Sequence, residues 1–155
     1  MELQINKELI QLFSECDVFK QLDENDLAEL ATMMESQKYA TGEDLFKEGD
    51  PGGKMYIIAN GAVEVQKLRS HGSDRVVIAR FERGGVIGEM SLVDGMTRSA
   101  TVNVVQPTKV FTLSKESFDE MILNRKDLAN KVLLGMSMLL SLRLRNTSGW
   151  FADVF

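Results

Sequence analysis

Two charged residues stand in apolar company in the middle of this 155-residue chain. Glu89 lies in the stretch GGVIGEMSL, and Arg98 follows nine positions later in TRSATV. A guanidinium offers a planar fork of donors that matches two phosphate oxygens. An ionised carboxylate only accepts hydrogen bonds, so it suits a sugar hydroxyl instead. The two residues together predict a site for a ribose phosphate, and a plain Glu89–Arg98 ion pair that closes the loop is the alternative.

The residues around these charges fit an anion site. The run GEMSL is predicted to form one short helical turn, whose first amides, from Glu89 to Ser91, would lack partners within the helix and attract an anion. Gly88 would let a ligand approach the backbone closely. The hydroxyl of Ser99 can donate a further hydrogen bond. Asp94 is interpreted as a solvated turn residue.

Other kinds of chemistry lack the residues they need. His71 is the only histidine, and it stands in RSHGSD, which is typical of an exposed hairpin tip. Neither a histidine metal site, a cysteine zinc cluster nor a Ser–His–Asp triad can be assembled. The run GDPGGKM has too few residues between its glycines for a phosphate-binding P-loop. We therefore expect no enzyme activity, no catalytic residue, no metal and no cofactor.

The overall composition narrows the class of partner and the compartment. The net charge is −5 with no basic run, which argues against binding nucleic acid or an acidic membrane surface. No run approaches the roughly 18 apolar residues of a membrane span. Cys16 is the only cysteine, so an internal disulfide is impossible and a buried thiol is expected. A cytoplasmic location is predicted.

The order of hydrophobic patterns predicts a mainly β fold with flanking helices. Short segments rich in β-branched residues, separated by turns, fill the middle of the chain and indicate an antiparallel β-roll of jelly-roll type. Helical spacing precedes them, with Asp23 as a helix N-cap, and returns after them with Ser114 as an N-cap. We expect a single domain, residues 1–155, divided into N-terminal helices (1–37), a β-roll (38–113) and C-terminal helices (114–155).

The last helix is unusually apolar. It is predicted over about residues 127–146 and has hydrophobic residues around most of its circumference. Packing on its own β-roll and packing against a second copy, as a homodimer, both remain open. The inward candidates are Val132, Leu133, Met136, Leu139, Leu140 and Leu144.

The stretch IGEMSLVDGMTRSATV resembles the phosphate-binding cassette of cyclic nucleotide-binding domains, with the pattern F-G-E-(aliphatic)-A/S-L followed by P-R-x-A-T-V. We call residues 87–102 the cassette. The preceding YATGEDLFKEGDPGGKMYIIANGAVEV is similar to the opening β-roll of that family. Two positions depart from the pattern, Ile87 in place of Phe and Thr97 in place of Pro. Neither family residue binds the ligand through its side chain, so we expect altered loop stiffness rather than lost binding.

The resemblance implies a role for each site residue. Arg98 would hold the phosphate, supported by Ser99 and the cassette amides, and Glu89 would accept the ribose 2′-hydroxyl. The last helix would cover the base, as in catabolite-activator-type regulators, with Thr147 and Ser148 at adenine, unless 146–149 is only a helix end. Trp150 or Phe151 could stack on the base or pack on the roll. The implied ligand-binding set is Val77, Ile87, Gly88, Glu89, Met90, Ser91, Arg98, Ser99, Ala100, Thr147 and Ser148.

The resemblance, which includes the regulatory subunits of protein kinase A, implies a sensor that binds cAMP or cGMP and moves its C-terminal helices. Ser99 favours cAMP, because some members that prefer cGMP have Thr there. The chain ends at Phe155, too soon for a helix-turn-helix, so we do not expect this chain to bind DNA by itself. We expect a stand-alone, bacterial-like member that acts on a protein effector, or else a piece of a longer protein. The alternative is an interaction module whose cassette binds no nucleotide.

Overall fold

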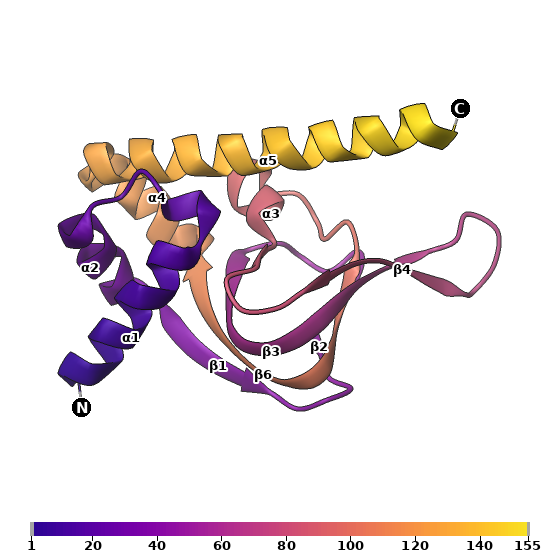
Figure 1. Ribbon diagram of the computed structural model, residues 1–155, viewed down its shortest axis with the longest axis horizontal. Helices are drawn as coiled ribbons and strands as arrows, with labels where there is room; N and C mark the ends of the chain where they lie inside the picture. Colours follow the sequence, from indigo (N-terminus) through magenta and orange to yellow (C-terminus); the bar gives the residue numbers. More distant parts are fainter. Residues whose placement is uncertain (1, 155) are drawn as a thin grey trace.

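The computed structural model describes the backbone of residues 2–154 and the side chains of residues 7–149. Three short helical elements come first, one short helix interrupts the strands, and two helices close the chain (Figure 1). They are α1 (Glu2–Glu15), η1 (Asp17–Phe19), α2 (Glu24–Thr32), α3 (Glu89–Asp94), α4 (Lys115–Asn124) and α5 (Lys126–Val154). None of the described helices combines the length and apolarity that a membrane span requires.

Six antiparallel strands form one curved sheet with the order β1-β6-β3-β4, while β2 pairs with β6 and β5 pairs with β3. The two longest strands, β3 and β6, shift register several times along their pairing, and such bulges bend a sheet. The predicted β-roll with flanking helices is therefore confirmed. The strands are β1 (Glu35–Tyr39), β2 (Asp44–Phe46), β3 (Lys54–Leu68), β4 (Arg75–Phe81), β5 (Val86–Ile87) and β6 (Thr101–Ser114).

Two hydrophobic clusters meet at the cassette. One lies where the helices pack on the sheet and includes Phe13, Phe19 and Leu92 of α3. The other fills the inside of the roll and includes Ile87 and Val102. The start and end of the cassette are thus anchored in the roll, while the helix between them is anchored against the flanking helices.

Both predicted N-caps are present. The Asp23 side chain accepts a hydrogen bond from the Asp26 amide at 2.9 Å, and the Asp26 side chain accepts one from the Asp23 amide at 3.0 Å. The Ser114 hydroxyl accepts a hydrogen bond from the Ser117 amide at 3.1 Å. Each cap satisfies an amide that the first turn of its helix leaves free, which fixes where that helix begins.

The first half of α5 is fixed against the N-terminal helices. At Gly135 a Cβ atom would lie 1.8 Å from the carbonyl oxygen of Val18, so only glycine allows α5 to approach η1 this closely. One turn earlier, Lys131 of α5 donates to Asp26 of α2 at 2.5 Å. The N-terminal helices and the start of α5 therefore form one packed unit.

The second half of α5 differs from expectation. The helix continues through Thr147 and Ser148 to Val154, so the predicted end near residue 146 is wrong. Both hydroxyls donate to backbone carbonyls four residues earlier, which is compatible with a continuing helix. Leu144 is 68% exposed rather than inward. Between residues 141 and 149 only Arg143 is not exposed, and these turns extend away from the helical end of the molecule (Figure 1).

Candidate functional site

Two glycines in left-handed conformation bound the short helix of the cassette. Gly88 precedes α3 with φ of 78°, and Gly95 follows it with φ of 68°, a region that side chains rarely tolerate. A Cβ atom at Gly88 would also lie 2.6 Å from an Arg98 nitrogen and 2.9 Å from the Lys54 carbonyl oxygen. The predicted helical turn at GEMSL is present, and its first residue lies directly beside the guanidinium of Arg98.

Arg98 is only 5% exposed, yet its donors are incompletely used. One terminal nitrogen donates to the Lys54 carbonyl at 2.8 Å and the other to the Gly88 carbonyl at 3.4 Å. Its Nε has no hydrogen-bond partner among the described residues. An unpaired buried donor costs roughly 1–3 kcal/mol, and desolvation by burial lowers the pKa of Arg98. An anionic oxygen that accepts a hydrogen bond from Nε would remove this cost. The sequence predicts that Arg98 binds such an anion, a phosphate.

Aromatic rings lie against the Arg98 guanidinium. Its central carbon is 4.1 Å from the ring centroid of Phe46 and 5.7 Å from that of Tyr56. An arginine at such distances is attracted by the negative face of the ring. This contact compensates part of the cost of burying the charge, and neither ring was predicted from the sequence as a site residue.

Glu89 is 3% exposed and does not pair with Arg98. Its carboxylate accepts a hydrogen bond from Arg143 of α5, which also donates to the Val86 carbonyl at 2.7 Å. The Arg143 guanidinium lies 5.1 Å from the ring centroid of Phe81. The alternative of a Glu89–Arg98 ion pair is therefore wrong. Arg143 was missed because LRLRN contains two arginines, and the sequence does not show which of them faces the roll.

The chain after α3 is fixed by a neighbouring turn. The Arg98 amide donates to the Asp50 carbonyl at 2.8 Å, and the Gly49 amide donates to the Arg98 carbonyl at 2.9 Å. Lys67 of β3 donates to the Ser99 carbonyl at 2.5 Å. These bonds hold the backbone of Arg98 although Thr97 replaces the proline of the family pattern.

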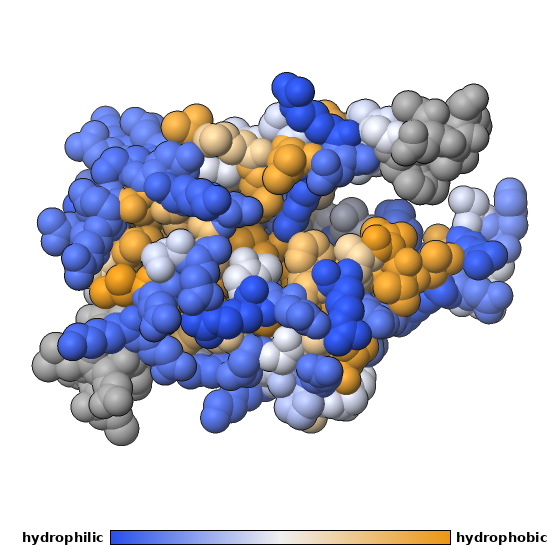
Figure 2. Space-filling model, in the orientation of Figure 1, coloured by the Kyte–Doolittle hydropathy of each residue, from blue (hydrophilic) through white to orange (hydrophobic). Residues whose placement is uncertain are grey.

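The other predicted site residues fall into two groups. Ile87, Ser91 and Ala100 are buried in the cassette, while Met90 and Ser99 are exposed at its surface. Outside the cassette the predicted residues are exposed. Val77 lies in β4, where Figure 2 shows apolar surface, and the hydroxyls of Thr147 and Ser148 bond within α5. The side chains of Trp150 and Phe151 lie outside the described residues.

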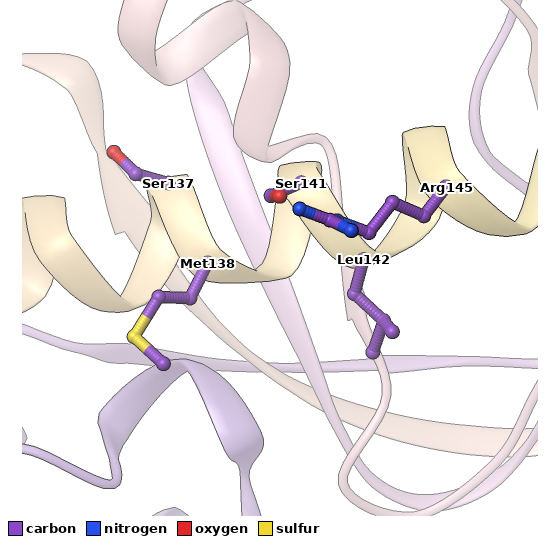
Figure 3. Close-up of a pocket in the computed structure, with 5 residues that line it drawn as sticks. All are labelled: Ser137, Met138, Ser141, Leu142 and Arg145. Atoms are coloured by element: carbon purple, nitrogen blue, oxygen red, sulfur yellow. The ribbon is translucent and has the colours of Figure 1, made fainter.

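A hollow of about 390 Å³ lies along α5 and contains no residue of the cassette. Met138 and Leu142 project from one side of the helix there, beside Arg145 (Figure 3). The hollow is open and every residue that lines it belongs to α5, so it is an open groove along one helix face rather than an enclosed ligand site. Met138 at this groove also accepts a hydrogen bond from the side chain of Gln21 at 3.1 Å. Its lining is Ser137, Met138, Ser141, Leu142 and Arg145.

The residues considered for other chemistry lie apart from this site. His71 is exposed in the turn between β3 and β4, as expected. Cys16 is buried after α1, and burial raises the pKa of its thiol to about 12, so the thiol is inert at neutral pH. Among the described side chains, no group of three or more His, Cys, Asp or Glu residues is arranged to hold a metal ion.

The comparisons agree with this geometry. The family model described as the cyclic nucleotide-binding domain matches residues 36–125. A cAMP-dependent protein kinase regulatory subunit of Eremothecium gossypii is 33% identical over 105 residues, which are 68% of this chain and 22% of that protein. The chain thus spans less than a quarter of that relative's length.

Two solved structures resemble the whole arrangement. A cyclic nucleotide-binding domain from Methylobacillus flagellatus has a TM-score of 0.86 at 28% identity and covers 98% of this chain and 85% of its own. The catabolite activator protein of Thermus thermophilus has a TM-score of 0.79 at 27% identity, with coverage of 89% and 62%. The matched segment includes the buried arginine and carboxylate of the cassette, and on these grounds the chain belongs to the cyclic nucleotide-binding domain family.

Proposed function

We propose that this protein binds a cyclic nucleotide, cAMP in preference to cGMP, and carries out no chemistry on it. The observation that carries the proposal is Arg98, a buried guanidinium next to the start of α3 whose Nε has no hydrogen-bond partner among the described residues. Such a donor set suits a phosphate, whose oxygens accept charge-assisted hydrogen bonds. Family membership points to the same ligand class.

The nucleotide would lie along the cassette. Its phosphate would bind Arg98, Ser99 and the amides of residues 88–91, and its ribose 2′-hydroxyl would bind Glu89. Ala100 and Val77 would pack on the nucleotide from the roll. The hydroxyls of Thr147 and Ser148 now bond to carbonyls of α5. They would reach adenine only by giving up these bonds, which requires α5 to close over the cassette.

Occupancy would be relayed through α5. Glu89 is already bound by Arg143 of that helix, so a ribose hydroxyl at Glu89 alters the contact that holds the second half of α5. A ligand shifts an equilibrium only by its differential affinity for the two arrangements. The shared carboxylate supplies such a difference, and the moved helix would act on a protein effector in the cytoplasm.

We further propose a homodimer through α5. Leu134, Met138 and Leu142 are each about half exposed and recur every four residues along the helix. A second copy of the same stripe would cover them, as in two-helix packing. The acidic chain is not proposed to bind nucleic acid or a membrane.

Isothermal titration calorimetry with cAMP and cGMP tests the binding. The wild type is expected to bind cAMP more tightly than cGMP, and Arg98→Ala is expected to lose this binding. Arg69→Ala, which removes an exposed arginine between β3 and β4, serves as the matched control and keeps it. A wild type that binds neither nucleotide would leave the interaction module as the surviving alternative.

A further inference from the structure

We infer that Phe46 is a positioning residue that holds Arg98 ready for the phosphate through a cation–π contact. The inference rests on the proposed function for its ligand. Phe46 ends β2, and its ring centroid lies 4.1 Å from the central carbon of the guanidinium. This is the closer of the two aromatic contacts that Arg98 makes.

The contact with Phe46 is compatible with phosphate binding because it does not use the N–H donors of the Arg98 guanidinium. The N–H donors of a guanidinium lie in its plane, whereas cation–π attraction acts across the face of the ring. The Lys54 and Gly88 carbonyls take two donors of Arg98, and Nε remains unpartnered among the described residues. Phe46 therefore restrains the orientation of the arginine without occupying the donor that the phosphate needs.

Phe46 is itself held in place. Its Cα pairs with that of Val102 in β6, four residues after Arg98. Its ring contacts that of Tyr56 with centroids 5.6 Å apart and the planes tilted by 44°. Tyr56 belongs to β3 and is part of the cluster inside the roll. The ring is thus fixed to the strand that leaves the cassette and to the core beneath it.

The alternative is that Phe46 only fills space. The two roles separate when the ring is fluorinated stepwise, because fluorine withdraws charge from the ring face while changing its volume little. We expect the dissociation constant for cAMP to rise with each added fluorine at Phe46, by roughly three- to thirtyfold over the series. The same series at Phe118, a buried ring that makes none of the described cation–π contacts, is the control and is expected to stay flat.

A second measurement needs no ligand. Fluorination of Phe46 should lower the urea midpoint of unfolding in the wild-type background and leave it unchanged in the Arg98→Met background. Midpoints that respond equally in both backgrounds, or a flat series for cAMP in a protein that binds it, would overturn the inference. If the wild type binds no cyclic nucleotide, the proposed function fails, and the unfolding series still decides whether Phe46 holds Arg98.

Discussion

Glu89 at the start of α3 is paired with Arg143 in the second half of α5. Arg143 is the one side chain between residues 141 and 149 that is not exposed, so among the described residues this pair joins the end of α5 to the cassette. The residue proposed to bind ribose and the residue that holds the helix are thus in direct contact. The proposed function therefore predicts that occupancy of the cassette and the position of α5 change together.

Removal of the Arg143 side chain should free the end of α5. In Arg143→Met, the amides of residues 141–149 are expected to exchange hydrogen faster with solvent. The free energy of unfolding should fall by about 1–3 kcal/mol, because Glu89 is left buried without its charged partner. Hydrogen exchange with mass spectrometry and urea unfolding measure the two effects. Arg145→Met, which removes the neighbouring exposed arginine, is the control, and equal exchange in both variants would contradict the role of Arg143.

The proposed ribose contact predicts discrimination between nucleotides. A hydrogen bond to a charged acceptor contributes about 1.5–3 kcal/mol, so 2′-deoxy-cAMP should bind the wild type roughly 10- to 150-fold more weakly than cAMP. Glu89→Gln should bind cAMP more weakly and show a smaller difference between the two ligands. Competition calorimetry gives both ratios. A wild type that binds the two ligands equally would place the ribose elsewhere.

The cassette could be predicted in detail because its residues are close in sequence and each has few possible roles. Gly88, the short helix and the two charges follow from local pattern and charge, whereas the left-handed Gly95 that ends α3 was not predicted. Arg143 and Phe46 could not be predicted in the same way. They reach the site through the packing of α5 and the pairing of β2 with β6, which depend on contacts between distant segments.

The end of α5 shows the same limit. The run NTSG has the composition of a helix stop, but the hydroxyls of Thr147 and Ser148 bond back to the helix instead. The prediction that Leu144 is buried was wrong for a related reason. Periodicity identifies apolar positions, but it does not tell how far the supporting surface of the roll extends beneath them.

Substitution of glycine by alanine should have opposite effects on stability at two positions of α5. Gly135→Ala forces a Cβ atom against the Val18 carbonyl and should destabilise the protein by about 2 kcal/mol or more, because neither backbone can yield cheaply. A Cβ atom at Gly149 would meet no other described atom within 4 Å, so Gly149→Ala should raise helix stability by up to about 1 kcal/mol. Urea unfolding compares the variants. Similar effects at both positions would show that α5 does not need the close contact with η1.

The contact between Asp26 and Lys131 predicts a dependence on pH. The hydrogen bond from Lys131 lowers the pKa of Asp26 from its ordinary 3.8. A lowered pKa in the folded state gives stability that is present above about pH 4 and is lost as the pH falls through the folded value. Lys131→Met should therefore lose less stability than the wild type on acidification below pH 4. Lys126→Met, at an exposed position on the same helix, is the control, and its free energy of unfolding should follow the wild-type dependence on pH. If Lys131→Met also followed the wild type, the pair would contribute nothing to stability.

The exposed stripe on α5 predicts a concentration-dependent dimer. Three half-exposed apolar side chains, Leu134, Met138 and Leu142, recur at four-residue spacing along α5. Sedimentation at micromolar concentration should show a dimer for the wild type and a monomer for Met138→Lys, since a charge at the centre of the stripe would be buried unpaired. Leu123→Lys places the same charge on an exposed leucine of α4 and should leave the dimer intact. A monomeric wild type, or equal weakening by both variants, would show that α5 is not the contact between copies.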